Sequence, residues 1–267
     1  MIKVANFQMP FDPISEKELK FAKKLIKDNH LDYLFFVVDE EGILPKDQRI
    51  KLLEKALSPY KKMVVGQCQA KTYSLDDIDE EVIRKGQFVK ACPGIRGELV
   101  SKQYYIDEIV KSNCNQHRTA HSYEVAKLCV QLAKAHGVDT NLAYLTGLLH
   151  DITKAQPDEW HQRIMEIYCP ENLEYSPPVW HSFTAPWWIK TNMGINDPVM
   201  LNAIYEHTLG RGQSKLAKIL FIADKCEPTR GYDTSKQIGL SMQNLNEGFK
   251  LVKHEQEEYL KKENGNG

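Results

Sequence analysis

Hydrophobic positions follow two different patterns in the two halves of the chain. In residues 1–98, short apolar runs alternate with charged, amphipathic stretches. The run LDYLFFVV at residues 31–38 is apolar, aromatic and β-branched, which is typical of a buried strand. Residues 15–29 and 46–57 instead place their apolar side chains at helical spacing. Further short strands are expected at residues 3–8, 63–65 and 88–91. This alternation predicts a small parallel α/β sheet.

The second half, from about residue 103, has helical spacing throughout. An apolar stripe runs along residues 118–136, and Gly137 then suits the end of that helix. Later helices are expected to begin after the capping residues Asp139, Asp197 and Ser214. The sequence therefore predicts an α/β plus all-α chain. A small Rossmann-like domain over residues 1–102 precedes an all-helical bundle over residues 103–267.

The composition is that of a globular protein. The chain has 267 residues, 42% of them hydrophobic, and its 35 basic side chains balance 36 acidic ones. A net charge near zero disfavours bulk binding to nucleic acid or to an acidic membrane surface. No apolar run approaches the ~20 residues that cross a bilayer, and the start lacks a secretory signal. We therefore expect a cytoplasmic protein with no nucleic-acid or membrane partner; whether it forms a homodimer stays open.

The six cysteines are widely separated along the chain. None forms a C-x-x-C pair of the kind that holds zinc or exchanges disulfides. In a cytosolic protein such residues are packed, reduced thiols by default.

Ionisable side chains stand at four positions where the helical pattern calls for a core residue: His121, His150, His207 and Asp224. A buried carboxylate is costly unless it is paired or bound to a metal. Each histidine taken alone is better interpreted as a hydrogen-bonded core residue. Four such positions together, with Asp151 directly after His150, favour a metal site, because imidazole and carboxylate ligate divalent ions.

Successive residues point about 100° apart on a helix. His150 and Asp151 can therefore reach one ion only at a helix end. His121 and Asp224 would complete this first site from other helices, while His181 and His207 could hold a second ion. Four further histidines have polar surroundings and are interpreted as surface residues: His30, His136, His161 and His254.

Five motifs occur in order along the helical half: HRTAHS at 117–122, GLLHDITK at 147–154, HSFTA at 181–185, AIYEHTLGR at 203–211 and IADKCEPTR at 222–230. With them, residues 103–250 resemble the HD-domain metal-dependent phosphohydrolases. Within these they are similar to the symmetrical diadenosine tetraphosphate hydrolases. The chain departs from the family pattern at Thr184, where a glycine is usual, and at Leu209, which replaces a threonine.

The resemblance implies a helical bundle around one or two divalent ions, with iron the first choice and manganese, cobalt, nickel or zinc as alternatives. It implies that His121, His150, Asp151 and Asp224 hold one ion. His181 and His207 would complete a second site, with Asp151 as bridge. Asp151 and Lys154 are the implied catalytic residues. The implied substrate-binding residues are Arg118, Lys154, His181, His207, Thr208, Gly210, Arg211 and Arg230.

The chemistry expected of such a site follows from charge. Two ions would neutralise a polyphosphate and acidify a bridging water. The resulting hydroxide would attack a β-phosphorus, and symmetrical cleavage of diadenosine tetraphosphate would give two ADP. Lys154 shares the face of His150 if that helix continues through it. Two alternatives stay open: an HD phosphohydrolase for another nucleotide, and a non-catalytic nucleotide-binding scaffold.

The N-terminal half carries a second resemblance. FDPI at residues 11–14, LDYLFFVV, and DQRIKLLEKAL at residues 47–57 are similar to segments of nicotinate-nucleotide adenylyltransferases. The two histidines expected to bind the triphosphate are replaced by Ser15 and Glu18. Since a glutamate repels a triphosphate, we predict a degenerate domain without adenylyl transfer. The alternative is a chance match within an unrelated α/β domain.

Aromatic and proline residues cluster around His181. Residues 169–186 contain several prolines and are expected to form a loop that frames this histidine. One of the four tryptophans (Trp160, Trp180, Trp187 and Trp188) could stack on an adenine. Core and lid packing is the preferred interpretation of these tryptophans.

Overall fold

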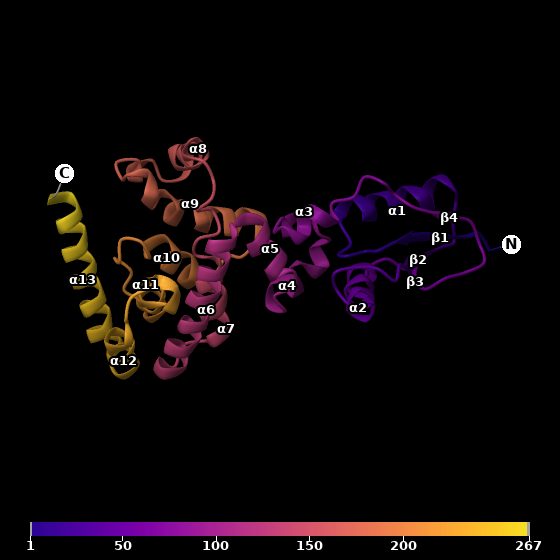
Figure 1. Cartoon of the computed structure of the whole chain (residues 1–267). Coiled ribbons are helices and arrows are strands. Elements are labelled where there is room, and N and C mark those ends of the chain that lie inside the picture. The colour runs from indigo at the N-terminus through magenta and orange to yellow at the C-terminus, as the bar shows by residue number, and fades with distance from the viewer. Residues whose placement is uncertain (1, 266–267) are drawn as a thin grey trace. The chain divides into compact units, whose positions relative to one another are not determined.

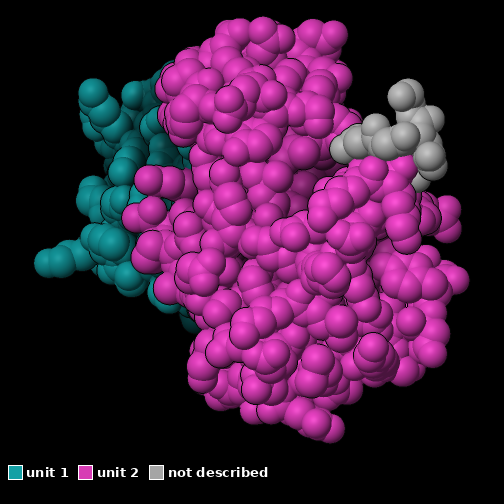
Figure 2. Space-filling view, turned by 90° about the vertical axis from the view of Figure 1, so that its left-hand side faces the viewer, with its two compact units in different colours: residues 1–109, 191–195 teal, residues 110–190, 196–267 magenta. Residues whose placement is uncertain are grey.

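The computed structural model of the chain describes residues 2–265 (Figure 1). It divides into two compact units, which Figure 2 colours teal and magenta. Unit 1 comprises Met1–Ile109 with Thr191–Ile195, and unit 2 comprises Val110–Lys190 with Asn196–Gly267. The small parallel sheet lies in unit 1 and the helical bundle in unit 2, so the predicted fold class is confirmed.

Unit 1 is built on a four-stranded parallel sheet with the strand order β3-β2-β1-β4. The strands are β1 (Val4–Met9), β2 (Tyr33–Val38), β3 (Met63–Val65) and β4 (Thr72–Tyr73). Helices α1 (Glu16–Asp28) and α2 (Lys46–Leu57) connect the first three strands. Phe7, Phe11 and Phe36 are fully buried and their rings pack edge to face or tilted, which forms the core of this unit.

The rest of unit 1 is irregular or helical. The remaining elements are α3 (Glu80–Arg84), the 3₁₀ turn η1 (Phe88–Lys90), α4 (Pro93–Ser101) and α5 (Ile106–Asn113), which crosses the division between the units. The strand expected at residues 88–91 is wrong. Only Ala91 pairs there, in an isolated antiparallel bridge to Ser15. The fourth strand is the two-residue β4, too short to show a periodic pattern.

Unit 2 is a bundle of α-helices (Figure 1). Its long helices are α6 (Gln116–His136), α7 (Thr140–Leu149), α8 (Asp158–Tyr168), α9 (Trp180–Trp188), α10 (Pro198–Glu206), α11 (Lys215–Cys226), α12 (Ser235–Gln243) and α13 (Leu245–Gly265). Short 3₁₀ turns between them are η2 (Pro170–Asn172), η3 (Pro177–Val179) and η5 (Pro228–Arg230), and the π-helical segment η4 (Ile189–Met193) crosses the division between the units.

The expected helix ends of unit 2 are confirmed by their hydrogen bonds. Asp139, Asp197 and Ser214 each accept backbone N–H groups at the start of α7, α10 and α11. Gly137 ends α6 in the left-handed conformation, with φ of 64°. These caps fix where each helix begins, and so which side chains face the interior.

Helices α6 and α7 approach each other closely. A Cβ atom on Gly147 of α7 would lie 2.7 Å from Ala126 Cα of α6, so only glycine fits without displacing a helix. The two helices lie side by side in Figure 1. This contact brings the C-terminal end of α7 next to the first turns of α6.

The loop expected at residues 169–186 is wrong for its second part. Trp180–Trp188 form α9 and His181 lies in its first turn, while residues 169–179 consist of irregular chain with the 3₁₀ turns η2 and η3. Proline is compatible with this arrangement, since Pro177 and Pro178 stand in the 3₁₀ turn η3 that leads into α9.

The structure also shows the state of the cysteines and the character of the helices. All six cysteines are free thiols, five of them buried, as expected. Across the described part of the chain, no helix combines the length and apolar character that a membrane crossing needs.

Candidate metal centre

Six ionisable side chains from five helical segments of unit 2 meet in its interior. His121 comes from α6, His181 from α9 and Asp224 from α11. His150 and Asp151 follow the last residue of α7, and His207 follows the last residue of α10. Each of the six is at most 5% exposed, so water cannot solvate their charges freely.

The end of α7 lets two consecutive residues face the same point. The helix stops at Leu149, and the chain turns through Asp151. His150 Nε2 lies 3.7 Å from Asp151 Oδ1 and 3.7 Å from Asp224 Oδ1. His150 and Asp151 therefore lie at a helix end, the position from which two consecutive residues can reach one ion.

On the other side of Asp151 stand two more imidazoles. His181 Nε2 lies 3.1 Å from Asp151 Oδ1 and 3.2 Å from His207 Nε2. The Thr208 hydroxyl lies 3.2 Å from His207 Nε2. Asp151 is thus the carboxylate shared by two pairs of histidines, His121 with His150 and His181 with His207.

Three of the histidines have the same orientation. Nδ1 of His150 donates to the Gly147 carbonyl at 2.7 Å, and Nδ1 of His207 donates to the Ile204 carbonyl at 2.6 Å. Nδ1 of His181 lies 3.0 Å from the Pro178 carbonyl. Each carbonyl is three residues earlier in the chain, so the Nε2 atom of each of these rings points into the cluster.

The donor set fits a divalent metal ion. Three groups each bring their ligand atoms within 4.8 Å of one another: His121, His150 and Asp151; His150, His207 and Asp224; Asp151, His181 and His207. Within the described residues, the buried Nε2 atoms of His121 and His150 have no hydrogen-bond partner. Buried polar atoms without partners are costly unless something else, such as a metal ion, satisfies them.

The cluster holds its two carboxylates ionised and two of its imidazoles neutral, whereas Asp151 and Asp224 outweigh burial and raise the pKa of His150. Burial would raise the pKa of Asp151, but His150 and His181 outweigh it and hold that pKa well below its usual value. Burial likewise opposes ionisation of Asp224, yet Lys225, His121 and His150 keep its pKa well below the usual value. Burial lowers the pKa of His181 and, more strongly, of His207. Ionised carboxylates and neutral imidazoles are the forms that bind metal.

Known proteins share this part of the chain. The HD domain family matches residues 118–229. The symmetrical bis(5'-nucleosyl)-tetraphosphatase of Bacillus subtilis (strain 168) is 32% identical over 126 residues, which cover 46% of this chain and 68% of that protein.

The chain belongs to this family of HD-domain hydrolases.

A second relative of the HD hydrolase combines two activities in its name. The probable nicotinate-nucleotide adenylyltransferase/Ap4A hydrolase of Mycoplasma genitalium is 30% identical over 159 residues. The match covers 55% of this chain and 45% of the relative, so the chain spans less than half of that protein. A crystal structure from Clostridium acetobutylicum, described as a predicted HD superfamily hydrolase involved in NAD metabolism, is 29% identical with a TM-score of 0.53. It covers 60% of this chain and 87% of its own.

Cationic side chains border the cluster of the HD domain. An Arg118 guanidinium N–H donates to Asp151 Oδ2 at 2.6 Å. Arg230 donates to Asp224 Oδ1 at 2.6 Å, and Lys225 donates to Asp224 Oδ2 at 2.5 Å. Lys225 is a contact that the sequence analysis missed, although it directly follows Asp224 in the motif IADKCEPTR.

Lys154 reaches the cluster by a different route from the one expected. The α7 helix does not continue through it, so the helical spacing argument for Lys154 is wrong. The turn after α7 instead brings Lys154 Nζ within 2.8 Å of His181 Nδ1 and into contact with the Pro178 carbonyl. Burial lowers the Lys154 pKa to about 8.

Arg211 and Gly210 serve the turn after α10. Arg211 donates to Glu206 at 2.8 Å and to the Tyr175 hydroxyl at 3.0 Å, two partners outside the His/Asp cluster. Gly210 has a φ of +60°, and a Cβ there would lie 2.5 Å from the Phe221 ring. The glycine is therefore needed for this turn, whatever else the segment binds.

The prediction that His161 is a surface residue is wrong. His161 on α8 is 3% exposed, not a surface residue. Its Nδ1 lies 2.8 Å from the Thr184 hydroxyl, which in turn lies 3.1 Å from the Thr153 hydroxyl. Thr184, where the family pattern has glycine, therefore fills a place in a buried polar network beneath His181.

An open groove adjoins the cluster. It has a volume of about 720 Å³ and runs between the end of α11, η5, α12 and α13. Lys225 and Arg230 stand at its wall, and both also contact Asp224. Tyr232, Tyr259 and Leu260 supply an aromatic and apolar lining.

In unit 1, the residues that replace the two expected histidines make contacts with each other. Ser15 and Glu18 form a capping box at the start of α1, in which each side chain accepts the other residue's backbone N–H. Arg49, fully buried, donates to four backbone carbonyls, three of them directly after β1 or β2 and one, that of Leu44, in the loop before α2. Asp12 of the FDPI segment accepts from the Tyr105 hydroxyl at 2.5 Å.

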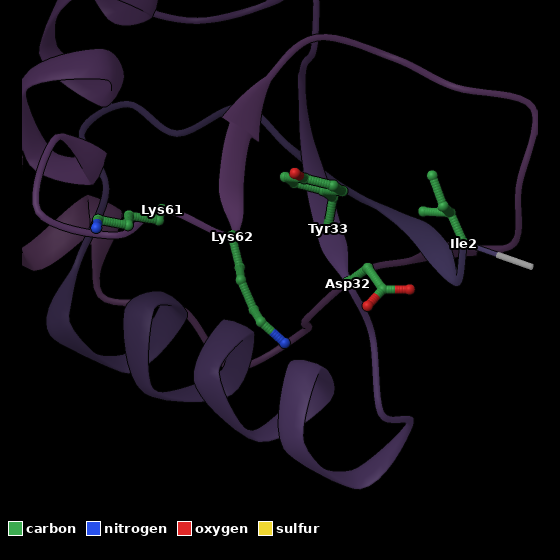
Figure 3. Close-up of a pocket in the computed structure, with 5 residues that line it drawn as sticks. All are labelled: Ile2, Asp32, Tyr33, Lys61 and Lys62. Carbon is green, nitrogen blue, oxygen red and sulfur yellow. The ribbon is translucent and has the colours of Figure 1, made fainter.

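A separate surface pocket of unit 1 is shown in Figure 3. Two of its charged groups are engaged locally: Asp32 accepts the Lys3 backbone N–H at 2.8 Å, and Lys62 Nζ donates to the Leu31 carbonyl at 2.9 Å. None of the residues predicted to form the site lines this pocket, which is bordered by Ile2, Asp32, Tyr33, Lys61 and Lys62.

Proposed function

We propose that this chain hydrolyses diadenosine tetraphosphate symmetrically, giving two molecules of ADP. The observation that carries the proposal is the buried His/Asp cluster of the HD domain, bordered by Arg118, Lys225 and Arg230. A polyanionic substrate needs such cationic groups beside the reacting phosphorus. The names of the relatives agree with this substrate class.

Two ion positions that share Asp151 are proposed, with iron as the first choice and manganese, cobalt, nickel or zinc as alternatives. His121, His150 and Asp224 hold the first ion together with Asp151, and His181 and His207 complete the second. A bound divalent ion supplies Lewis acidity and lowers the pKa of water. Mixed imidazole and carboxylate donors suit each of these metals.

The cationic side chains that border the His/Asp cluster are proposed to bind the phosphates. Arg118 and Arg230 present planar guanidinium groups, which bind phosphate oxygens in pairs. Lys154, beside His181, places a point charge near a phosphoryl oxygen. In the reaction a water oxygen would bond to one β-phosphorus, and the bond between that phosphorus and the oxygen that bridges to the other half of the substrate would break. The bridging oxygen would leave as part of one ADP, the other ADP would carry the water oxygen, and the two water protons would pass to the new phosphate oxygens or to solvent.

The groove beside Asp224 suits one nucleoside of the substrate. Its cationic wall at Lys225 and Arg230 meets the phosphates, while the rings of Tyr232 and Tyr259 can stack on a base. Thr208, Gly210 and Arg211 are proposed to contact the substrate from the turn after α10.

A product assay tests this proposal. Metal-loaded protein is incubated with diadenosine tetraphosphate, and the nucleotides are separated. ADP alone supports the proposal, whereas AMP plus ATP contradicts symmetrical cleavage. Turnover of a different nucleotide in a substrate panel would favour another HD phosphohydrolase. Tight nucleotide binding without any turnover would favour a scaffold.

We propose further that unit 1 performs no adenylyl transfer. The Ser15–Glu18 capping box occupies the helix start where the related enzymes bind a triphosphate, and Glu18 adds an acid there. The expected result is no pyrophosphate release from ATP and nicotinate mononucleotide. Release at a rate that depends on protein concentration would contradict it.

A further inference from the structure

Glu227 is a buried carboxylate next to the metal centre that the proposed mechanism does not use. It follows the last residue of α11 and caps η5, and it is 1% exposed. Its Oε2 accepts the Thr229 backbone N–H at 2.6 Å, and its Oε1 accepts the Thr229 hydroxyl at 2.7 Å. Oε1 also lies 2.9 Å from His121 Nδ1.

These contacts determine the tautomer of His121. Glu227 accepts on both oxygens, from the Thr229 backbone N–H and from the Thr229 hydroxyl. Its Oε1 also accepts from the imidazole at 2.9 Å, so the proton of the His121 ring lies on Nδ1. The Nε2 lone pair then faces Asp224 Oδ1 at 3.2 Å, inside the cluster.

His121 differs in this respect from the other three histidines of the centre. His150 and His207 each place Nδ1 against a neutral backbone carbonyl, and Nδ1 of His181 lies near both the Pro178 carbonyl and Lys154 Nζ. His121 alone has a carboxylate as partner, in the arrangement carboxylate–imidazole–ligand position. A carboxylate partner raises the basicity of the coordinating nitrogen and fixes the ring, and such partners are worth 10–100-fold in metal affinity.

We propose that Glu227 is a positioning residue for His121, which makes the ion position at His121 bind metal more tightly than the position at His181 and His207. The inference rests on the proposed metal-dependent function and adds an order of occupancy to it. Under limiting metal the first ion enters beside His121, and the second position fills afterwards.

Equilibrium dialysis of the metal-free chain against Zn²⁺, followed by metal analysis, tests this. The wild type is expected to show two classes of site. Glu227→Gln keeps the size of the side chain and removes its charge, and it should weaken the tighter class about 10–100-fold while leaving the weaker class unchanged. Asp197→Asn is the matched control, because Asp197 also caps a helix but only through the N–H groups of Val199 and Met200.

Equal affinities in Glu227→Gln and the wild type would overturn the inference while leaving the proposed function standing. A wild type without any bound metal would overturn both. Should Glu227→Gln not fold, the metal-free wild type decides by ¹⁵N NMR of its imidazoles. The His121 signals, assigned from their loss in His121→Gln, are expected to show a protonated Nδ1. A proton on Nε2 would contradict the role of Glu227.

Discussion

At the scale of single residues, the centre depends on imidazole and carboxylate groups that cannot be solvated by water. Asp151 is the residue whose loss is expected to matter most, because it lies between His150 and His181 and pairs with Arg118. Removing its charge leaves two buried histidines and an arginine without their common counter-charge.

We predict that Asp151→Asn and His150→Ala each lower the turnover of diadenosine tetraphosphate at least about 100-fold, since loss of a ligand exceeds the 10–100-fold effect of its supporting partners. The helices around the site keep their packing, so far-UV circular dichroism should match that of the wild type. Full activity in either variant would refute the metal assignment.

A second prediction at this scale concerns Glu18 in unit 1. Burial, followed by the nearby Glu80 charge, raises the Glu18 pKa to about 8, against the opposing hydrogen bonds from Ser15. The folded state therefore holds this proton more tightly than the unfolded state does. The stability it contributes is fully present below the ordinary value of 4.5 and is lost as the pH rises to about 8.

Glu18→Gln cannot ionise and keeps an oxygen for the Ser15 N–H. It should leave the free energy of unfolding nearly unchanged at pH 4 and raise it by roughly 3–5 kcal/mol above pH 8. Urea titrations at pH 4, 6 and 8 measure this, with Glu54→Gln on the exposed face of α2 as control. A difference that does not grow with pH would show that Glu18 does not titrate in this way.

The sequence predicts most of the proposed metal ligands but few of the buried residues that form hydrogen bonds around them. His121, His150, His207 and Asp224 stood out because ionisable groups break an apolar stripe. The buried position of His161 could not be predicted in this way, because its partner Thr184 lies 23 positions away and only the packing of α8 against α9 brings the two residues together. Glu227 was missed for a similar reason, since its partner His121 is 106 positions earlier.

At the scale of elements, helix ends and one close contact place the ligands. The caps at Asp139, Asp197 and Ser214 were readable from the sequence because they act within four residues. The helix at Trp180–Trp188 was not readable, since the prolines of residues 169–186 suggest a loop while the buried side chains of α9 favour a helix. The short β4 was missed because its pairing with β1 is not local.

The contact at Gly147 gives a prediction at this scale. Gly147→Ala puts a methyl group 2.7 Å from Ala126 Cα, so α7 must move away from α6 and carry His150 with it. We expect a loss of about 1–3 kcal/mol in unfolding free energy together with weaker metal binding. Denaturant titration and metal dialysis measure the two effects.

Gly239→Ala in α12 is the matched control, because nothing lies within 4 Å of the added methyl group. It should stabilise the chain by about 0.5–1 kcal/mol, the usual gain of alanine over glycine inside a helix. A Gly147→Ala variant as stable as this control would mean that α6 and α7 are not packed against each other through Gly147.

At the scale of the whole molecule, the metal should stabilise one unit and not the other. The six cluster residues all belong to unit 2 and come from five of its helical segments, so a bound ion links elements that unfolding separates. Unit 1 contributes none of the residues in the three ligand groups. A ligand that binds only the folded state adds about 2.7 kcal/mol at 100 times its dissociation constant.

The tryptophans make this difference measurable. Trp160, Trp180, Trp187 and Trp188 are the only four in the sequence, and all of them lie in unit 2. Tryptophan fluorescence therefore reports the unfolding of the helical bundle, while the tyrosines of unit 1 and far-UV circular dichroism also report the sheet. We predict that chelation lowers the midpoint of the fluorescence transition by several degrees. The Asp151→Asn variant should respond much less, because it lacks the shared ligand. An equal shift in wild type and variant would place the metal effect outside the His/Asp cluster.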